Sequence, residues 1–197
     1  MEKIKELVRW ELRKNNRMYE WNLHLIIVKK YADSLAEIYN ADREIVELSV
    51  WLHDIGRIRY GDINHHISGA QDAEIILRDH NYPQEIIDKV KECILSHRCE
   101  AKDRMPESLE AKILASADAM YTLDVVPIFF WEASHEMGLG VKESCDWVAD
   151  EIEKSWKKIL LPEGKDMVKG KYDAFKMIVA TTCESLNGEK NVRLQTA

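Results

Sequence analysis

Apolar residues recur along most of the chain at steps of three and four, the spacing that places them on one face of an α-helix. The clearest such stripe, within residues 19–39, consists of His24, Val28, Tyr31, Leu35 and Ile38. Only eight Gly and four Pro interrupt the chain, and neither an alternating strand pattern nor an internal repeat stands out. The pattern therefore predicts an all-α fold in which helices pack as a compact bundle.

Turn-forming and capping residues mark the ends of these helices. The expected helices cover approximately residues 4–15, 19–39, 42–56, 66–79, 84–96, 109–124, 141–160 and 165–186. Asp42 and Ser108 are suited to cap the third and sixth of them. Gly56 favours the left-handed conformation past a helix end, so we expect the third helix to stop there and residues 57–64 to form a loop. The tail after Gly188 is polar and is expected to fray.

The length of 197 residues is typical of one domain, and no linker divides it. We expect residues 20–125 to form the functional core and residues 126–187 a helical extension that covers it or contacts a second copy in a homodimer. The net charge is −7, from 28 Lys and Arg against 35 Asp and Glu. A negative surface repels nucleic acid at long range, so a long nucleic-acid partner is not expected.

Cysteine usage and hydropathy predict the compartment. The four cysteines are Cys93, Cys99, Cys145 and Cys183, and none lies in a Cys-x-x-Cys pair. The first residues lack the continuous apolar region of an export signal, so we expect reduced thiols in a cytoplasmic protein. No stretch approaches the ~20 apolar residues that cross a bilayer, so no membrane partner is expected.

Several ionisable residues interrupt the apolar stripes. His24 and His97 continue the inner faces of two predicted helices, and Asp118 lies between two alanines on a third. Such groups are costly on a buried face unless they are paired or bind a metal. His53 and Asp54 are neighbours, and neighbours on a helix point about 100° apart, so both reach one ion only where the helix ends. Imidazole and carboxylate ligands together suit Mn, Fe, Co, Ni, Zn or Mg.

The order of these residues along the chain is more specific than any one of them. They follow one another as His24, His53-Asp54, His65-His66, His97 and Asp118. This order resembles the HD-domain superfamily of metal-dependent phosphohydrolases, whose pattern is H…HD…H…H…D on an all-α scaffold. The resemblance covers about residues 24–124, just over half the chain. It implies an HD-type helical bundle with extra C-terminal helices.

The resemblance also implies a ligand set. The implied ligands of a central divalent ion are His24, His53, Asp54 and Asp118. The two intermediate histidine positions bind a second metal in some members and contact substrate phosphate in others. His97 occupies one of them. Either His65, which stands four residues before Gly69, or His66, which can share a face with Gly69, occupies the other.

The implied reaction is attack of a metal-activated water on a nucleotide or other small phosphate ester. Asp54 is the expected proton acceptor, and His65 or His66, with His97 and Arg98, would stabilise charge on the phosphoryl group. Arg57 and Arg98 are each either a phosphate contact or a solvated surface residue. Two histidines, His80 and His135, match no position of the pattern.

Two other functions fit the same ligand set. A few relatives with this pattern hold two irons and run an oxygenase reaction, and a non-catalytic domain could sense a nucleotide. Neither the identity nor the number of the ions follows from the residues. We expect substrate selectivity to lie in residues 57–64, in residues 98–106 and in the helices after Val125, where no motif is readable.

Overall fold

The computed structural model describes the backbone of residues 1–99 and 104–195 and the side chains of residues 1–99 and 104–182. Most of these residues lie in helices. No strand occurs within these ranges, so the predicted all-α fold is confirmed. The helices are α1 (Glu2–Lys14), η1 (Trp21–Leu25), α2 (Ile26–Tyr39), α3 (Arg43–Leu52), α4 (Ile55–Tyr60), α5 (His65–Asp79), α6 (Gln84–Ser96), α7 (Leu109–Tyr121), α8 (Val126–Trp131), η3 (Glu132–Glu136), α9 (Val141–Lys158) and α10 (Pro162–Gln195).

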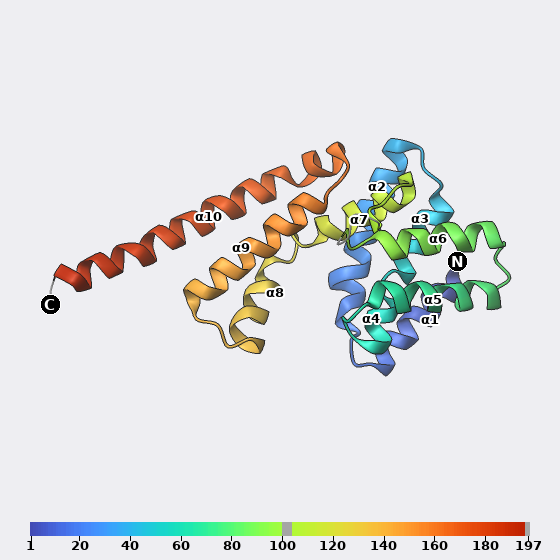
Figure 1. The fold of residues 1–197 in the computed structure, drawn as a ribbon, viewed down its shortest axis with the longest axis horizontal. Coiled ribbons are helices and arrows are strands. Elements are labelled where there is room, and N and C mark those ends of the chain that lie inside the picture. The colour runs from blue at the N-terminus through green and yellow to red at the C-terminus, as the bar shows by residue number, and fades with distance from the viewer. Residues whose placement is uncertain (100–103, 196–197) are drawn as a thin grey trace.

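These helices form two groups that lie side by side (Figure 1). The first group, α1 to α7, packs into a bundle around side chains with no more than 1% exposure, such as Leu35, Leu52, Ile94 and Leu114. The second group consists of α8, η3, α9 and α10, and α10 projects from it away from the bundle. Burial of apolar side chains, which contributes about 25 cal/mol of stabilising free energy per Å² of buried apolar surface, is the main force that holds the bundle together.

α7 is the central helix and contacts α2, α3, α6, α9 and α10. Its residues Ala111, Ile113, Leu114 and Met120 are completely buried. Among the described residues, no single helix has the length and hydropathy of a membrane span. The pair Leu109–Tyr121 and Val126–Glu136, bent by 62°, passes that test only when its two parts are taken together.

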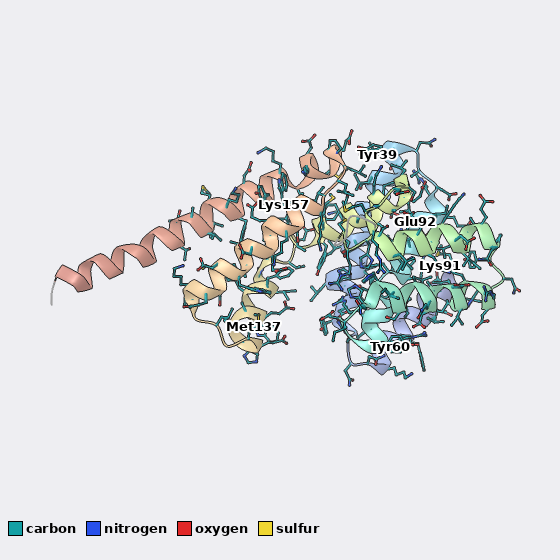
Figure 2. All side chains as sticks on the ribbon, viewed as in Figure 1. Tyr39, Tyr60, Lys91, Glu92, Met137 and Lys157 are labelled. Atoms are coloured by element: carbon teal, nitrogen blue, oxygen red, sulfur yellow. The ribbon has the colours of Figure 1, made fainter. Side chains whose placement is uncertain are left out.

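The helix boundaries follow local sequence signals in several places. The Asp42 carboxylate accepts hydrogen bonds from two backbone N–H groups at the start of α3, and the Ser108 hydroxyl accepts one at the start of α7, so both predicted caps are confirmed. The predicted inner stripe of α2 is wrong at Ile38, which is 51% exposed. Tyr39, which is partly buried, packs against the core instead, and its hydroxyl contacts Glu163 at the start of α10 (Figure 2).

The segment after α3 differs from the prediction. α3 ends at Leu52, and residues 55–60, expected to be partly helix and partly loop, form the separate helix α4 because Ile55 and Ile58 are both buried. Gly56 lies inside α4 and does not end a helix. A Cβ atom on Gly56 would lie 2.4 Å from the backbone oxygen of His65 and 2.5 Å from the backbone nitrogen of Gly69. A glycine is needed there because α4 and α5 touch through their backbones.

The last helix is longer than predicted. The expected helix began near Lys165 and frayed after Gly188, whereas α10 runs from Pro162 to Gln195. Proline suits the first turn of a helix, where its missing N–H group has no partner to lose. Asp124, in the turn after α7, forms a salt bridge with Lys171, and this joins α10 to the bundle.

Candidate metal centre

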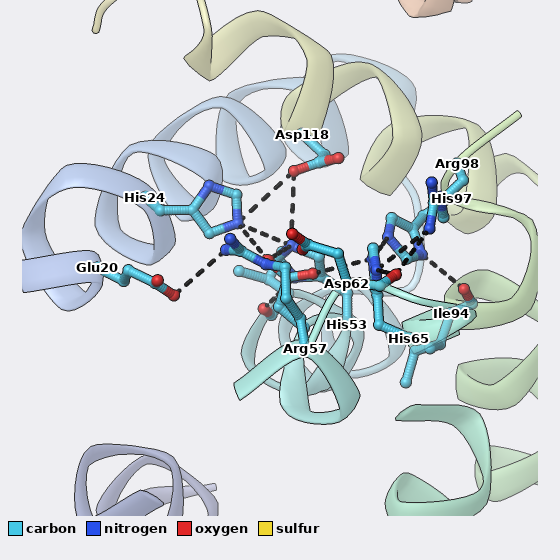
Figure 3. A network of polar contacts seen from close by, with 12 residues as sticks. Glu20, His24, His53, Arg57, Asp62, His65, Ile94, His97, Arg98 and Asp118 are labelled. Atoms are coloured by element: carbon cyan, nitrogen blue, oxygen red, sulfur yellow. Dashed lines mark hydrogen bonds and ion pairs between the residues drawn. The ribbon is translucent and has the colours of Figure 1, made fainter. Parts of the chain in front are cut away.

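Three separate places in the chain bring the predicted ligands of the central ion together (Figure 3). His24 lies in η1, a turn of π-helix at the start of α2, and such turns are common at functional sites. His53 and Asp54 occupy the joint between α3 and α4, so the two adjacent side chains leave the backbone where the helix direction changes. Asp118 comes from α7. The side chains of His24, His53 and Asp54 are all at least 93% buried.

The first group of donor atoms consists of His24, His53, Asp54 and Asp118. The Nε2 atoms of His24 and His53 are 3.0 Å apart. Each of these nitrogens lies 3.1 to 3.7 Å from one oxygen of Asp54 and one oxygen of Asp118. Two donors bound to one ion at about 2.1 Å stand roughly 3.0 to 3.5 Å apart. The spacing of this group therefore fits a single divalent ion.

A second group shares Asp54 with the first. His65 Nε2 lies 3.3 Å from the other carboxylate oxygen of Asp54 and 3.3 Å from His97 Nε2. Asp54 thus directs one oxygen to each group. His66 is also buried, but its Nε2 atom contacts Arg104 at 2.7 Å, so the structure brings His65 and not His66 to the centre.

Backbone hydrogen bonds orient three of the imidazole rings. In each ring the Nδ1–H group donates to the carbonyl oxygen three residues earlier, which leaves the Nε2 lone pair facing the centre. These bonds join His53 to Val50, His65 to Asp62 and His97 to Ile94, at 2.8, 3.0 and 2.6 Å. A bond of this kind is the usual companion of a metal-binding imidazole, because it selects the tautomer that can ligate. His24 differs, since its Nδ1 atom is buried without a hydrogen-bond partner.

The electrostatics of the centre also favour a cation. Burial opposes a charge on His53, yet the carboxylates of Asp54 and Asp118 outweigh it and raise the pKa of His53 to about 9. Burial acts against ionisation of Asp54 too, but the charges of Arg57 and His53 hold its pKa well below the usual range. Burial, followed by the charge of His53, lowers the pKa of His97 to about 4. Two ionised carboxylates thus face the centre, and a divalent ion bound there would take the place of the proton on His53.

Arg57 holds Asp54 in place and is not a solvated surface residue. Its Nε atom donates to the Asp54 carboxylate at 2.8 Å, and its Nη2 atom donates to Glu20 at 3.2 Å. Glu20 is itself bonded to Arg17 at 2.5 Å. The guanidinium group is therefore already paired with two buried carboxylates, which leaves it little capacity to bind phosphate.

A cavity of about 220 Å³ opens beside both donor groups. Arg98 lines it from the bundle, and Phe129 of α8 with Ser155 and Lys158 of α9 lines it from the C-terminal helices. These helices therefore form a wall of the site. The sequence motifs did not identify Lys158 as a site residue. Its position could have been inferred from helical spacing, because Glu151, Ser155 and Lys158 lie on one face of the predicted helix.

A second cavity, of about 400 Å³, adjoins the first. Five residues line both of them: His24, Arg57, Tyr121, Phe129 and Glu151. The remaining wall of the second cavity is partly apolar, from Leu23, Ile128 and Trp147, and partly acidic, from Asp62 and Glu132. Residues 57–64, where we expected selectivity, thus contribute Asp62. The other expected segment, 98–106, contributes Arg98 to the first cavity.

Comparison of the sequence with known proteins gives a family match and distant relatives. The family model described as HD domain matches residues 23–123. A tRNA (cytidine(56)-2'-O)-methyltransferase of Picrophilus torridus is 34% identical over 110 residues, which are 51% of this chain and 31% of that protein. An uncharacterized protein of Methanocaldococcus jannaschii is 34% identical over 109 residues, 48% of this chain and 62% of that protein. The chain thus matches less than two thirds of either relative.

Two solved structures share the fold. A crystal structure of an HD-superfamily hydrolase from Bacillus thuringiensis has a TM-score of 0.72 and 17% identity, and the match covers 94% of this chain and 96% of that one. A predicted HD-superfamily hydrolase from an uncultured Thermotogales bacterium has a TM-score of 0.56 and 24% identity, with 78% and 85% covered. The first match includes nearly the whole chain, and so extends to the C-terminal helices.

Proposed function

Because the chain belongs to the HD-domain family, we propose that it is a metal-dependent phosphohydrolase acting on a nucleotide or another small phosphate ester. One observation carries the proposal. The donor atoms of His24, His53, Asp54 and Asp118 converge beside a cavity that also contains the cationic side chains of Arg98 and Lys158. A metal site next to positive charge suits a substrate with a phosphoryl group.

The metal is proposed to occupy the first donor group, where the spacing and charge fit it. A bound divalent ion would polarise a phosphoryl oxygen and lower the pKa of a water molecule. Asp54 is positioned to accept the proton of the attacking water, because its carboxylate lies between the two donor groups and next to the cavity. Arg57 holds that carboxylate in place through its hydrogen bond.

The cationic and aromatic residues of the cavity have separate tasks. Arg98 and Lys158 approach the cavity from the bundle and from α9, so they are placed to stabilise negative charge on the phosphoryl oxygens. Phe129 covers the same cavity from α8 and limits the access of water. His65 and His97, whose Nε2 atoms lie 3.3 Å apart, would hold a second metal together with Asp54 or contact the phosphoryl group directly.

The test is a phosphate-release screen. The protein is stripped with EDTA and assayed with nucleotides and small phosphate esters after addition of Mn, Co, Ni, Fe, Mg or Zn. We expect no activity without metal and restored activity with at least one ion. Asp54→Asn should lower kcat/KM by about 10²- to 10⁴-fold, the range for loss of a general base, with an unchanged helical circular dichroism spectrum.

The matched control is His135→Ala, because His135 stacks on Trp131 away from both donor groups. Its activity should stay within about twofold of the unaltered protein, as for most exposed positions. Full activity of Asp54→Asn would contradict the proposed reaction. Tight nucleotide binding without hydrolysis under every metal would favour a sensing role instead.

The shared Asp54 also supports a second candidate function, a di-iron oxygenase. A carboxylate that directs its two oxygens to separate histidine-containing groups suits two neighbouring ions. Elemental analysis of protein purified without chelator distinguishes the two functions. Two irons per chain, together with oxygen consumption and no phosphate release, would replace the phosphohydrolase proposal.

A further inference from the structure

The second cavity begins where the metal centre ends. It shares His24 and Tyr121 with the first cavity, so a molecule that reaches the metal centre can extend into it. Its volume of about 400 Å³ is within the range of small-molecule pockets, roughly 300 to 1,000 Å³. Phosphate ester hydrolysis needs space for the leaving group beside the phosphoryl group. The second cavity supplies that space.

Aromatic and aliphatic side chains form one side of this cavity. Phe129 of α8 and Trp147 of α9 contact each other with ring centroids 6.2 Å apart, and both are only partly buried. Leu23 and Ile128 continue the apolar surface. Leu23 is 41% exposed, so this surface faces the cavity mouth and not the core. Such a surface favours a planar, apolar group that can stack on the rings.

Carboxylates form the other side. Glu132, on the π-helix η3, faces the cavity together with Asp62 and Glu151. The only cation in the described lining, Arg57, is already paired with the carboxylates of Asp54 and Glu20. Burial, followed by the negative charge of Glu136, raises the pKa of Glu132, and the charge of Arg57 opposes this. A second phosphate is therefore repelled here, whereas N–H donors find acceptors.

Resting on the proposed function, we infer that this cavity is the leaving-group subsite. It selects esters with a single phosphate whose leaving alcohol carries a planar heteroaromatic ring bearing an amino group. An aminated nucleobase in a nucleoside monophosphate has this chemistry. The phosphate would lie beside Arg98 and Lys158 in the first cavity. The ring would lie against Phe129 and Trp147, with its amino group toward Glu132.

The experiment compares substrates that differ only in an amino or an oxo group. Values of kcat/KM are measured for cytidine against uridine 5'-monophosphate and for adenosine against inosine 5'-monophosphate, with p-nitrophenyl phosphate as a reference ester. We expect the amino-bearing member of at least one pair to be preferred by about 10- to 100-fold, because a site built to accept a hydrogen bond rejects a ligand that lacks the donor. The nucleoside diphosphates should be poorer substrates than the monophosphates.

The carboxylate is then tested by Glu132→Gln, which keeps the shape of the side chain and removes its charge. The amino-over-oxo ratio should fall at least about fivefold, since the amide also donates a hydrogen bond and so accepts an oxo group. Glu143→Gln is the matched control, because Glu143 is exposed near the start of α9 and does not line the cavity. It should leave the ratio unchanged.

The outcomes separate the two proposals. Absence of phosphate release from every ester, p-nitrophenyl phosphate included, would remove the phosphohydrolase proposal and the subsite with it. Hydrolysis of the reference ester with an amino-over-oxo ratio near one would overturn the subsite alone. A high ratio that survives Glu132→Gln would also overturn it. The ratio in the unaltered protein needs no variant, so poor folding of a variant cannot decide the result.

Discussion

Arg57 bonds Asp54 through two nitrogens, with Nε at 2.8 Å and Nη2 at 2.6 Å from the same carboxylate oxygen. That oxygen also lies 3.1 Å from His24 Nε2. The hydrogen bonds fix the orientation of the one carboxylate that faces both donor groups. They also pair the almost completely buried negative charge of Asp54 with the positive charge of Arg57.

Removal of Arg57 should destabilise the metal-free protein. Arg57→Gln leaves the carboxylates of Asp54 and Glu20 buried without their shared cation. Loss of one partner from a buried ion pair costs up to 3–5 kcal/mol, and because Arg57 is 21% exposed we expect about 2 kcal/mol. Urea denaturation in EDTA measures the change.

The control for this substitution is Arg78→Gln on the exposed surface of α5. Arg78 is 61% exposed and pairs with Glu74 on its own helix, and such pairs contribute about 0.3 to 0.5 kcal/mol. Equal stabilities of the two variants would show that Arg57 does not hold Asp54 as described.

The positive charge of Lys158 should contribute to substrate hydrolysis and not to metal binding. Lys158→Ala removes a charged hydrogen-bond donor from the wall of the first cavity, and we expect kcat/KM to fall about 10- to 100-fold. Neighbouring Lys157 (Figure 2) is exposed and outside the cavity lining, so Lys157→Ala should change kcat/KM less than about twofold. Steady-state kinetics with the best substrate, at saturating metal, make the comparison. Similar values for the two variants would remove Lys158 from the site.

Gly56 should tolerate no side chain. A Cβ atom there would meet the backbone of α5 at 2.4 and 2.5 Å, so Gly56→Ala must push α4 from α5. We expect a loss of about 1–3 kcal/mol in the free energy of unfolding, measured from the midpoint of chemical denaturation. Gly170→Ala is the control, because its Cβ would meet no atom within 4 Å. Within a helix it should be neutral or stabilising by up to about 1 kcal/mol, and a result in the opposite order would refute the packing argument.

Cys93 should be protected in the folded protein. Cys93 is a buried thiol outside any disulfide, while the side chain of Cys183 lies outside the described range. Burial raises the pKa of the Cys93 thiol to about 12. Since an unfolded thiol ionises near pH 8.5, the contribution of this group to stability is present below about pH 8.5 and falls as the pH rises toward 12.

Alkylation with N-ethylmaleimide at pH 8, followed by peptide mass spectrometry, tests this protection. We expect Cys93 to react at least ~100-fold more slowly in folded than in denatured protein, because reaction requires opening of the bundle. Half-buried Cys99 should react faster than Cys93. Rapid native labelling of Cys93 would contradict its burial.

Local periodicity predicted much of the bundle and the direction of several ligands. The stripe that contains Val28 and Leu35 also contains His24, and the stripe that contains Ile94 leads to His97, so the inward direction of both histidines follows from the 3.6-residue repeat. The same repeat could not resolve the terminus of α3. From the sequence, Gly56 could either end a helix or allow a close backbone contact. Only the close packing of α5 against Gly56 shows that the second explanation holds.

Neighbouring residues posed a similar difficulty. His65 and His66 point about 100° apart on α5, and both faces of that helix are buried at its start. The packing of α5 against α4 and α6 directs His65 to Asp54 and His66 to Arg104. The spacing of residues along the chain does not predict which of the two histidines faces Asp54. This depends on how three helices are rotated against one another.

The sequence by itself determined the helical class, the caps of α3 and α7, and the set of histidines and aspartates that face inward, because each depends on residues within a few positions. Only the tertiary structure decided that Asp54 directs an oxygen to each donor group and that α8 and α9 cover the centre. The first feature depends on contacts between distant segments, and the second depends on the bend between α7 and α8. Local hydrophobic spacing specifies neither. The wall that contains Lys158 and the cavity beside Glu132 exist only in the folded chain.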